Sequence, residues 1–219
     1  MITRSLSGFL IKQGYENSLN NENNYDFGKI NKNLNNKNFV EIRNLGKGSC
    51  GIAYLIYHFV KQTICVLKEP NIEEPKLIER EQENYLRLNQ EQYPFIPRYY
   101  GYFEIYNEKY LLIEYIEGKS LDKYELELLS LQDKYNMIFG LILTIKFLHS
   151  LGYVYRDLKL DNIIINQNKE AILIDFDRLI KVETESQTID LNSPFLAPEL
   201  RKTYKSDVFS LGCIICYIL

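Results

Sequence analysis

Residues 155–162 read Tyr-Arg-Asp-Leu-Lys-Leu-Asp-Asn, and three of these side chains could act together on one substrate. Asp157 is a candidate proton acceptor, Lys159 supplies a cation, and Asn162 carries an amide oxygen that can bind a metal ion. A second acidic motif, Asp-Phe-Asp, begins further along the chain at Asp175. Carboxylate and amide oxygens are the ligands that Mg²⁺ prefers, so the two segments indicate a general base beside a magnesium site.

Together the two motifs resemble the catalytic loop and metal-binding motif of the eukaryotic protein kinases, in their serine/threonine branch. The loop, with Tyr where most kinases have His, is most similar to that of the protein kinase A, B and C group. The resemblance implies transfer of the γ-phosphate of ATP to a protein hydroxyl, with Mg²⁺ as cofactor. Asp157 would accept the hydroxyl proton, and Lys159 would neutralise the transferring phosphoryl group. Lys159 also favours Ser or Thr over Tyr as the acceptor, because tyrosine kinases of this family usually lack it. The metal would be held by Asn162 and Asp175.

A glycine-rich turn, Gly-Lys-Gly-Ser-Cys-Gly, occupies residues 46–51 between two predicted strands. Gly46, Gly48 and Gly51 let backbone N–H groups approach phosphate oxygens without a Cβ in the way. A position between two strands, rather than between a strand and a helix, argues against a dinucleotide-binding motif. By the resemblance, this turn would bind the phosphates of ATP.

Lys68 ends an apolar strand and would reach the α- and β-phosphates. Its ammonium needs a carboxylate to hold it in place, and we expect Glu81, on a predicted helix, to be that partner. Glu79 and Glu83 lie near it on the same helix, and an ungapped alignment puts Asn84 at the family position. These three residues therefore stay open as alternatives to Glu81.

The resemblance also implies an adenine slot. The backbone of Glu114 and Ile116 would hydrogen-bond the adenine edge, and Ile164 would form the floor. Ala53 stands where the family usually has Val, and Val66 stands where it usually has Ala. We infer an exchange of bulk that keeps the roof of the slot at similar volume, since cores tolerate volume-conserving exchanges best.

The hydrophobic periodicity predicts an α+β fold, which the resemblance specifies as a two-lobed kinase fold. The expected parts are an Asn-rich flexible leader (1–38), an ATP-binding lobe (39–116) and a partial second lobe with the catalytic loop (117–219). In the second lobe, Asp207 begins the last helix and would hydrogen-bond the backbone of the catalytic loop. The predicted strands are 39–42, 52–60, 63–68, 99–105, 109–116, 163–165 and 171–174, and the predicted helices are 74–88, 121–131, 135–149 and 207–219.

The composition argues against several classes of partner. A net charge of −3 over 219 residues gives no basic field for nucleic acid or an anionic membrane. The apolar run at 9–11 is too short for a signal-peptide core or a membrane span. The four cysteines show no disulfide pattern and suit a reducing cytosol, so we expect a cytoplasmic protein; a protein substrate is what the resemblance implies. The sequence carries no signal for the oligomeric state.

Several positions depart from the family pattern. Asp177 replaces the glycine of the usual Asp-Phe-Gly, and we expect it to stiffen the segment and add negative charge near the metal. The family's Thr that touches the catalytic Asp falls on Asn192, or on Ser193 with a shift. Cys50 lies in the glycine-rich turn and is a candidate redox-sensitive thiol.

The end of the chain gives a further departure. It ends at Leu219 inside an apolar helix, whereas the family has more helices that cover this helix and carry the Arg that pairs with Glu199. We therefore expect a fragment of a longer kinase that lacks the last helices of its second lobe. The alternative is a pseudokinase, a nucleotide-binding or scaffolding module without turnover.

Overall fold

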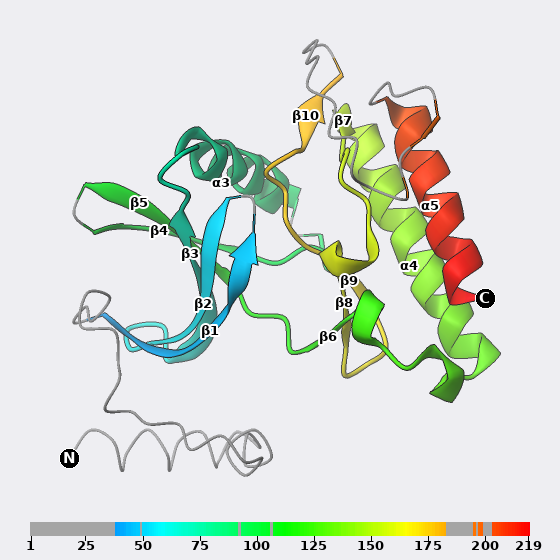
Figure 1. Cartoon of the computed structure of the whole chain (residues 1–219), viewed down its shortest axis with the longest axis horizontal. Helices are drawn as coiled ribbons and strands as arrows, with labels where there is room; N and C mark the ends of the chain where they lie inside the picture. The colour runs from blue at the N-terminus through cyan, green and yellow to red at the C-terminus, as the bar shows by residue number, and fades with distance from the viewer. Residues whose placement is uncertain are drawn as a thin grey trace.

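The structure is a computed structural model that describes residues 38–48, 50–91, 93–105, 107–182, 195, 197–198 and 203–219. Its elements form a β-rich lobe and a mainly helical lobe that lie side by side (Figure 1). This arrangement confirms the predicted two-lobed α+β fold. The predicted leader lies outside the described residues except for Asn38.

The first lobe is an antiparallel sheet with one helix against it. The strands are β1 (Phe39–Gly48), β2 (Gly51–His58), β3 (Thr63–Pro70), β4 (Tyr99–Ile105) and β5 (Glu108–Glu114), in the order β1-β2-β3-β5-β4. Helix α3 (Lys76–Leu88) contacts β3 and β5 and buries Ile78, Tyr85 and Leu88. The hairpin of β2 and β3 and the pair of β4 and β5 form where the alternation of apolar residues predicted them.

The two faces of β3 have different roles. Cys65 and Leu67 are buried in the core of the sheet, whereas Val66 and Lys68 line the cleft between the lobes. Successive side chains of a strand point to opposite faces, so one apolar strand both anchors the sheet and presents a lysine to the cleft.

The second lobe is built around two helices, α4 (Leu131–Ser150) and α5 (Tyr204–Ile218), which pack against each other. A capping box between Ser130 and Asp133 begins α4. Two small sheets complete this lobe: one contains β6 (Gly118–Ser120), β8 (Ile163–Asn166) and β9 (Ala171–Leu173), and the other pairs β7 (Tyr153–Val154) with β10 (Ile180–Lys181). Among the described residues, no helix combines the length and apolar character needed to cross a membrane.

The helix predicted over 121–131 is wrong. The structure has two separate 3₁₀ turns, Leu121–Lys123 and Leu126–Leu128, and α4 begins only at Leu131. The first leucine of each turn is buried, whereas Leu128 and Leu131 are exposed. Because the buried leucines do not form a continuous helical stripe, packing does not favour one helix over this segment.

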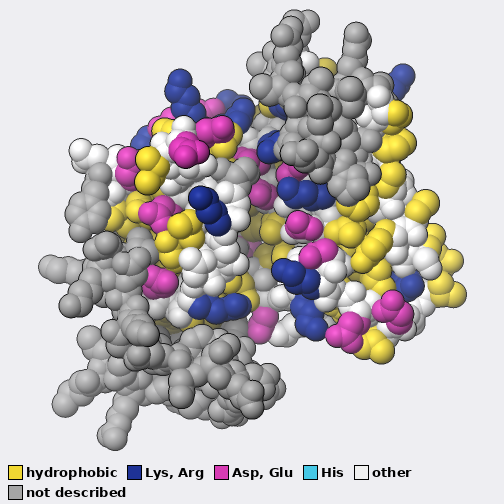
Figure 2. Space-filling model, in the orientation of Figure 1, with side chains coloured by type: hydrophobic (Ala, Val, Ile, Leu, Met, Phe, Trp, Pro, Cys, Tyr) yellow, Lys and Arg dark blue, Asp and Glu magenta, His cyan; other side chains and the backbone are white. Residues whose placement is uncertain are grey.

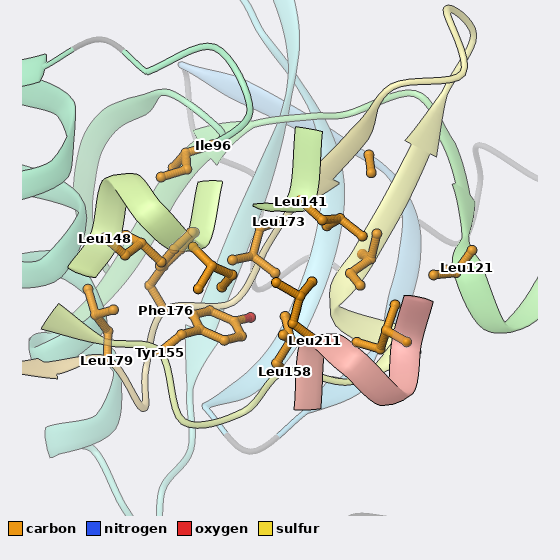
Figure 3. Close-up of a cluster of buried hydrophobic side chains, with 14 of the residues drawn as sticks. Ile96, Leu121, Leu141, Leu148, Tyr155, Leu158, Leu173, Phe176, Leu179 and Leu211 are labelled. Carbon is orange, nitrogen blue, oxygen red and sulfur yellow. The ribbon is translucent and has the colours of Figure 1, made fainter. Parts of the chain in front are cut away.

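Leucines of α4, the catalytic loop and α5 surround Tyr155 and Phe176 in the core (Figure 3). The described residues cover only part of the apolar last helix, α5. Exposed apolar side chains of α4 and α5 are Leu131, Tyr135, Phe139, Ile142, Val208, Phe209 and Tyr217. Apolar side chains also appear along the edge of the molecule where α4 and α5 lie (Figure 2).

Candidate active site

A cleft of about 830 Å³ lies between the two lobes, within the range of small-molecule pockets. It brings together every position that the sequence analysis assigned to nucleotide or metal binding. These positions are Gly46, Gly48, Gly51, Ala53, Val66, Lys68, Glu114, Ile116, Asn162, Ile164 and Asp175. The cleft therefore combines an apolar slot with a charged end, although the binding role of each residue stays a prediction.

Position 51 requires glycine because β2 and β3 approach each other closely there. Its φ is +138°, and a Cβ at this position would lie 1.8 Å from the carbonyl oxygen of Glu69 on β3. At Gly48, in contrast, a Cβ would meet no heavy atom within 4 Å. The turn thus leaves open space on its side of the cleft, which fits the prediction that a ligand approaches the backbone there.

Lys68 joins three elements at the charged end of the cleft. Its Nζ lies 2.6 Å from Glu81 Oε1 on α3 and 3.2 Å from Asp175 Oδ1, which follows β9. The Lys68 ammonium therefore ties the sheet to α3 and to the metal motif through charge-assisted hydrogen bonds.

Among the alternatives for the partner of Lys68, the structure selects Glu81. Glu79 and Glu83 are exposed and form ion pairs with other residues of the surface. The amide of Asn84 is buried and donates to the carbonyl oxygens of Phe176, at 2.8 Å, and Leu179, at 3.0 Å. Asn84 therefore holds the segment after the metal motif and does not contact the lysine.

The ion pair of Lys68 and Glu81 is largely shielded from water, and this burial affects the pKa of each group differently. Burial disfavours the charged ammonium, but Asp175 and Glu81 raise the pKa of Lys68 well above its ordinary value. Burial also raises the pKa of the Glu81 carboxyl, and the attraction of Lys68 opposes this shift. Asp175 and Asp177 add to the upward shift of Glu81 because they carry like charge. The charged end of the cleft therefore holds an excess of carboxylates.

In the catalytic loop, one oxygen of Asp157 is held while the other remains available. Asp157 Oδ2 lies 3.0 Å from Lys159 Nζ and 3.0 Å from Asn162 Nδ2. Its Oδ1 accepts no hydrogen bond from the described residues, so it can receive a proton from a substrate hydroxyl.

The oxygen atoms of Asn162 and Asp175 are also suitable ligands for a magnesium ion. Both hydrogen bonds of the Asn162 amide use Nδ2, one to the Asp157 carboxylate and one to its backbone carbonyl at 2.9 Å. The amide oxygen of Asn162 therefore remains as a ligand atom, and both Asn162 and Asp175 line the cleft. These are hard oxygen ligands of the kind that Mg²⁺ takes.

Asp207 of α5 supports the catalytic loop as predicted. Its carboxylate accepts hydrogen bonds from the backbone N–H groups of Tyr155, at 2.8 Å, and Arg156, at 2.9 Å. The same carboxylate contacts His149 Nε2 at 2.9 Å. Arg156 has a φ of +74°, and these contacts hold the loop in that uncommon conformation.

An aromatic column that the sequence analysis missed connects α3 to the catalytic loop. The rings of Tyr85 and Tyr155 pack edge-on against Phe176, with centroids 5.2 and 5.6 Å away. The hydroxyl of Tyr155 also donates to the backbone carbonyl of Ile174. The available signal was the spacing of Tyr85 from Glu81, four residues apart on one buried face of α3.

Some predicted residues cannot be compared with the structure. Asn192, Ser193 and Glu199 lie outside the described residues. Nearby, Ala197 is buried, and the Ser210 hydroxyl donates to the carbonyl of Phe195 at 2.6 Å.

Comparisons with known proteins agree with the resemblance from which this site was predicted. The family described as protein kinase domain matches residues 39–219. Serine/threonine-protein kinase D of Synechocystis sp. is 34% identical over 137 residues, which cover 57% of this chain and 27% of that protein. Dual specificity protein kinase zak2 of Dictyostelium discoideum is 37% identical over 139 residues, 57% of this chain and 21% of that protein. Serine/threonine-protein kinase CST20 of Candida albicans is 28% identical over 193 residues, 84% of this chain and 16% of that protein. The chain thus spans less than a third of the length of these relatives.

Proposed function

The chain belongs to the protein kinase family, and we propose that it is an ATP-dependent serine/threonine protein kinase acting on a hydroxyl of a protein substrate. The observation that carries the proposal is the contact of Lys68 with both Glu81 and Asp175. Phosphoryl transfer depends on positioning and electrostatic stabilisation, and this contact assembles both lobes around the charged end of the cleft.

Each polar residue of the cleft has a separate task in the proposed reaction. Lys68 binds the α- and β-phosphates of ATP, and the glycine-rich turn offers its backbone N–H groups to the phosphate oxygens. Asn162 and Asp175 hold Mg²⁺, which when bound supplies positive charge against the phosphate oxygens. Asp157 accepts the proton of the attacking hydroxyl through Oδ1, and Lys159 stabilises the phosphoryl group as it moves.

The acceptor class follows from Lys159 and from the names of two relatives, which are serine/threonine-protein kinases. The relative named as a dual specificity kinase makes tyrosine the competing acceptor. A cytoplasmic location is proposed on the cysteine pattern alone.

A second candidate, a nucleotide-binding module without turnover, is favoured by Asp177. This carboxylate is fully buried where a protein kinase usually has glycine, and it lies close to Asp175. Its negative charge could hold the metal motif in an arrangement that binds nucleotide but does not transfer phosphate.

The test is phosphate transfer from labelled ATP, in the presence of Mg²⁺, to peptides that differ only in a Ser, Thr or Tyr acceptor. We expect labelled Ser or Thr peptides with the natural chain and none with Lys68→Met. ATP binding without transfer to any acceptor would support the non-catalytic module, and label on Tyr alone would overturn the acceptor class.

A further inference from the structure

Three potential metal ligands that do not form a usual kinase magnesium site meet at the phosphate end of the cleft. Cys50 precedes β2 in the glycine-rich turn, and Asp175 and Asp177 follow β9. The Cys50 sulfur and one oxygen of each carboxylate all lie within 4.8 Å of one another. Two parts of the chain that are distant in sequence thus present one sulfur and two oxygen ligands to a common point.

The cluster is largely shielded from water. Cys50 is 4% exposed, Asp177 is 0% exposed, and the side chain of Asp175 is 22% exposed toward the cleft. Within the described part of the chain, the Cys50 sulfur forms neither a disulfide nor a hydrogen bond. The sulfur packs at the edge of the hydrophobic core, and the two carboxylates that approach it are both potential metal ligands.

The surrounding charge favours a cation. Three carboxylates, Glu81, Asp177 and Asp175, act electrostatically on Cys50. Lys68 opposes them, but its ammonium already contacts Glu81 and Asp175. Arg156 also interacts with Asp177, from the side of the catalytic loop. Carboxylates therefore dominate the field at Cys50, and a divalent ion there would offset their repulsion.

The ligand types indicate which ion fits. Mg²⁺ prefers oxygen ligands and octahedral geometry, whereas a thiolate favours softer ions such as Zn²⁺. Zinc takes sulfur at about 2.3 Å and carboxylate oxygen at about 2.0–2.2 Å, which puts tetrahedral ligands roughly 3.5 Å apart. Separations of up to 4.8 Å become suitable when side-chain rotation brings the ligands about 1 Å closer. A water molecule can complete the tetrahedron, and the thiol proton leaves to solvent as the Zn–S bond forms.

We propose that Cys50, Asp175 and Asp177 form a second cation site, which takes Zn²⁺ or a similar thiophilic divalent ion and closes the phosphate end of the cleft. The bound ion joins the glycine-rich turn to the metal motif, and it uses Asp175, which the Mg²⁺ of a bound nucleotide also requires. Occupation of this site therefore excludes nucleotide. Ion binding itself does not depend on catalytic turnover, so it can be measured even if the chain is not an active kinase.

The ion site is tested with Co²⁺ and Zn²⁺ on the full chain without nucleotide. Co²⁺ bound by a thiolate has a sulfur-to-metal charge-transfer absorption, and we expect this band to disappear in Cys50→Ser. Zn²⁺ affinity should fall at least tenfold in Cys50→Ser and in Asp177→Asn. The matched control is the double variant Cys213→Ser/Cys216→Ser, which removes the two cysteines of α5 and should leave the affinity unchanged.

A charge-transfer band and Zn²⁺ affinity that survive in Cys50→Ser would overturn the site. Loss of the charge-transfer band and of Zn²⁺ affinity in the control variant would place the bound ion at the cysteines of α5. That result would also overturn the proposed site. Cooperative thermal melts of each variant establish that a lost signal does not reflect unfolding; if Cys50→Ser does not melt cooperatively, Cys50→Ala is used in its place.

The exclusion of nucleotide needs a separate measurement. Zn²⁺ also binds free ATP and therefore lowers apparent ATP binding to any protein, so Cys50→Ser is the reference. We expect Zn²⁺ to reduce ATP binding to the natural chain more than it reduces ATP binding to Cys50→Ser. Equal reduction in both proteins would overturn the exclusion. Failure of ATP to bind without Zn²⁺ would instead contradict the proposed kinase function, and the two failures are therefore distinguishable.

Discussion

Lys68 Nζ and Glu81 Oε1 lie 2.6 Å apart, which joins the central strand of the first lobe to the helix beside it. The same ammonium reaches Asp175 at 3.2 Å, and the aromatic rings of Tyr85, Phe176 and Tyr155 connect the helix to the catalytic loop. The ion pairs and the ring packing thus both connect α3 to the segment of Asp175 and Phe176. The lysine thus lies between a buried carboxylate and the metal motif, which is the arrangement that the proposed phosphoryl transfer would use.

The roof of the adenine slot gives the first prediction. Ala53 and Val66 lie on the neighbouring strands β2 and β3, and both line the cleft. Ala53→Val adds bulk to a slot that already contains Val66. Overfilling costs about 1–3 kcal/mol, so the Kd for ATP should rise about tenfold. Calorimetric titration with ATP measures this change.

The matched control is the double variant Ala53→Val/Val66→Ala, which restores the total volume with the family's usual residues. We expect its Kd for ATP to return to within about threefold of the natural value. Tighter ATP binding by Ala53→Val alone would contradict the exchange of bulk.

Asp207→Asn should destabilise the second lobe. The buried carboxylate accepts one backbone N–H through each oxygen, from Tyr155 and from Arg156. An amide can replace only one acceptor, and its NH₂ group then faces a donor. The expected loss is about 1–3 kcal/mol in the free energy of unfolding, measured by urea denaturation. The exposed Asp122→Asn should change this value by no more than about 0.5 kcal/mol. Equal effects of the two variants would contradict the assigned role of Asp207.

Tyr155→Phe removes one hydroxyl from the core. This hydroxyl donates to the carbonyl of Ile174, immediately before Asp175. The buried carbonyl loses this donor, so we expect a loss of about 1–3 kcal/mol. For a chain of this size the Tm falls by about 2–4 °C per kcal/mol. Tyr135→Phe, at an exposed position on α4, is the control and should leave the Tm unchanged. A Tm for Tyr155→Phe equal to that of the natural chain would show that the contact contributes nothing.

The pH dependence of stability should carry a contribution from Glu81. Burial raises the pKa of its carboxyl from the ordinary value of 4.5 to about 7, with Asp175 and Asp177 acting in the same direction and Lys68 against it. The folded chain then binds more protons than the unfolded chain between pH 4.5 and the raised value. This contribution to stability is complete below pH 4.5 and is lost as the pH rises through the folded pKa.

Urea denaturation at a series of pH values measures this dependence. Glu81→Gln should show a smaller fall in the free energy of unfolding with rising pH than the natural chain does. Glu79→Gln, at an exposed position on the same helix, should keep the natural slope. If Glu81→Gln and the natural chain have the same slope, the carboxyl does not titrate in this range.

Much of the site could be predicted from the sequence because its residues occur in short motifs. One short segment contains Asp157, Lys159 and Asn162, and another contains the glycine-rich turn. In each segment the functional residues lie within a few positions of one another, so their spacing can be recognised in the sequence. The structure brings Asn162 and the glycine-rich turn to one cleft because β1 ends and β2 begins at that turn, and β8 begins directly after Asn162. The choice of Glu81 over its neighbours also followed from the face of a predicted helix.

Contacts between segments far apart in the sequence could not be predicted in the same way. Asn84 donates to Phe176 and Leu179, more than ninety positions away, and only the fold determines which carbonyls it meets. The 3₁₀ turns over 121–131 were missed because the predicted helix counted apolar residues and not their burial. The meeting of Cys50 with Asp177 likewise depends on how the turn of one lobe lies over the metal motif.

The central claim is that Asp157 acts on the substrate hydroxyl in a nucleotide site formed by Lys68, Glu81 and Asp175. The most direct test compares the natural chain with Asp157→Asn, measuring ATP binding and phosphate transfer on the same samples. We expect ATP binding within about threefold of the natural value and a transfer rate lower by a factor of about 100 or more. Transfer by Asp157→Asn at the natural rate would contradict the claim.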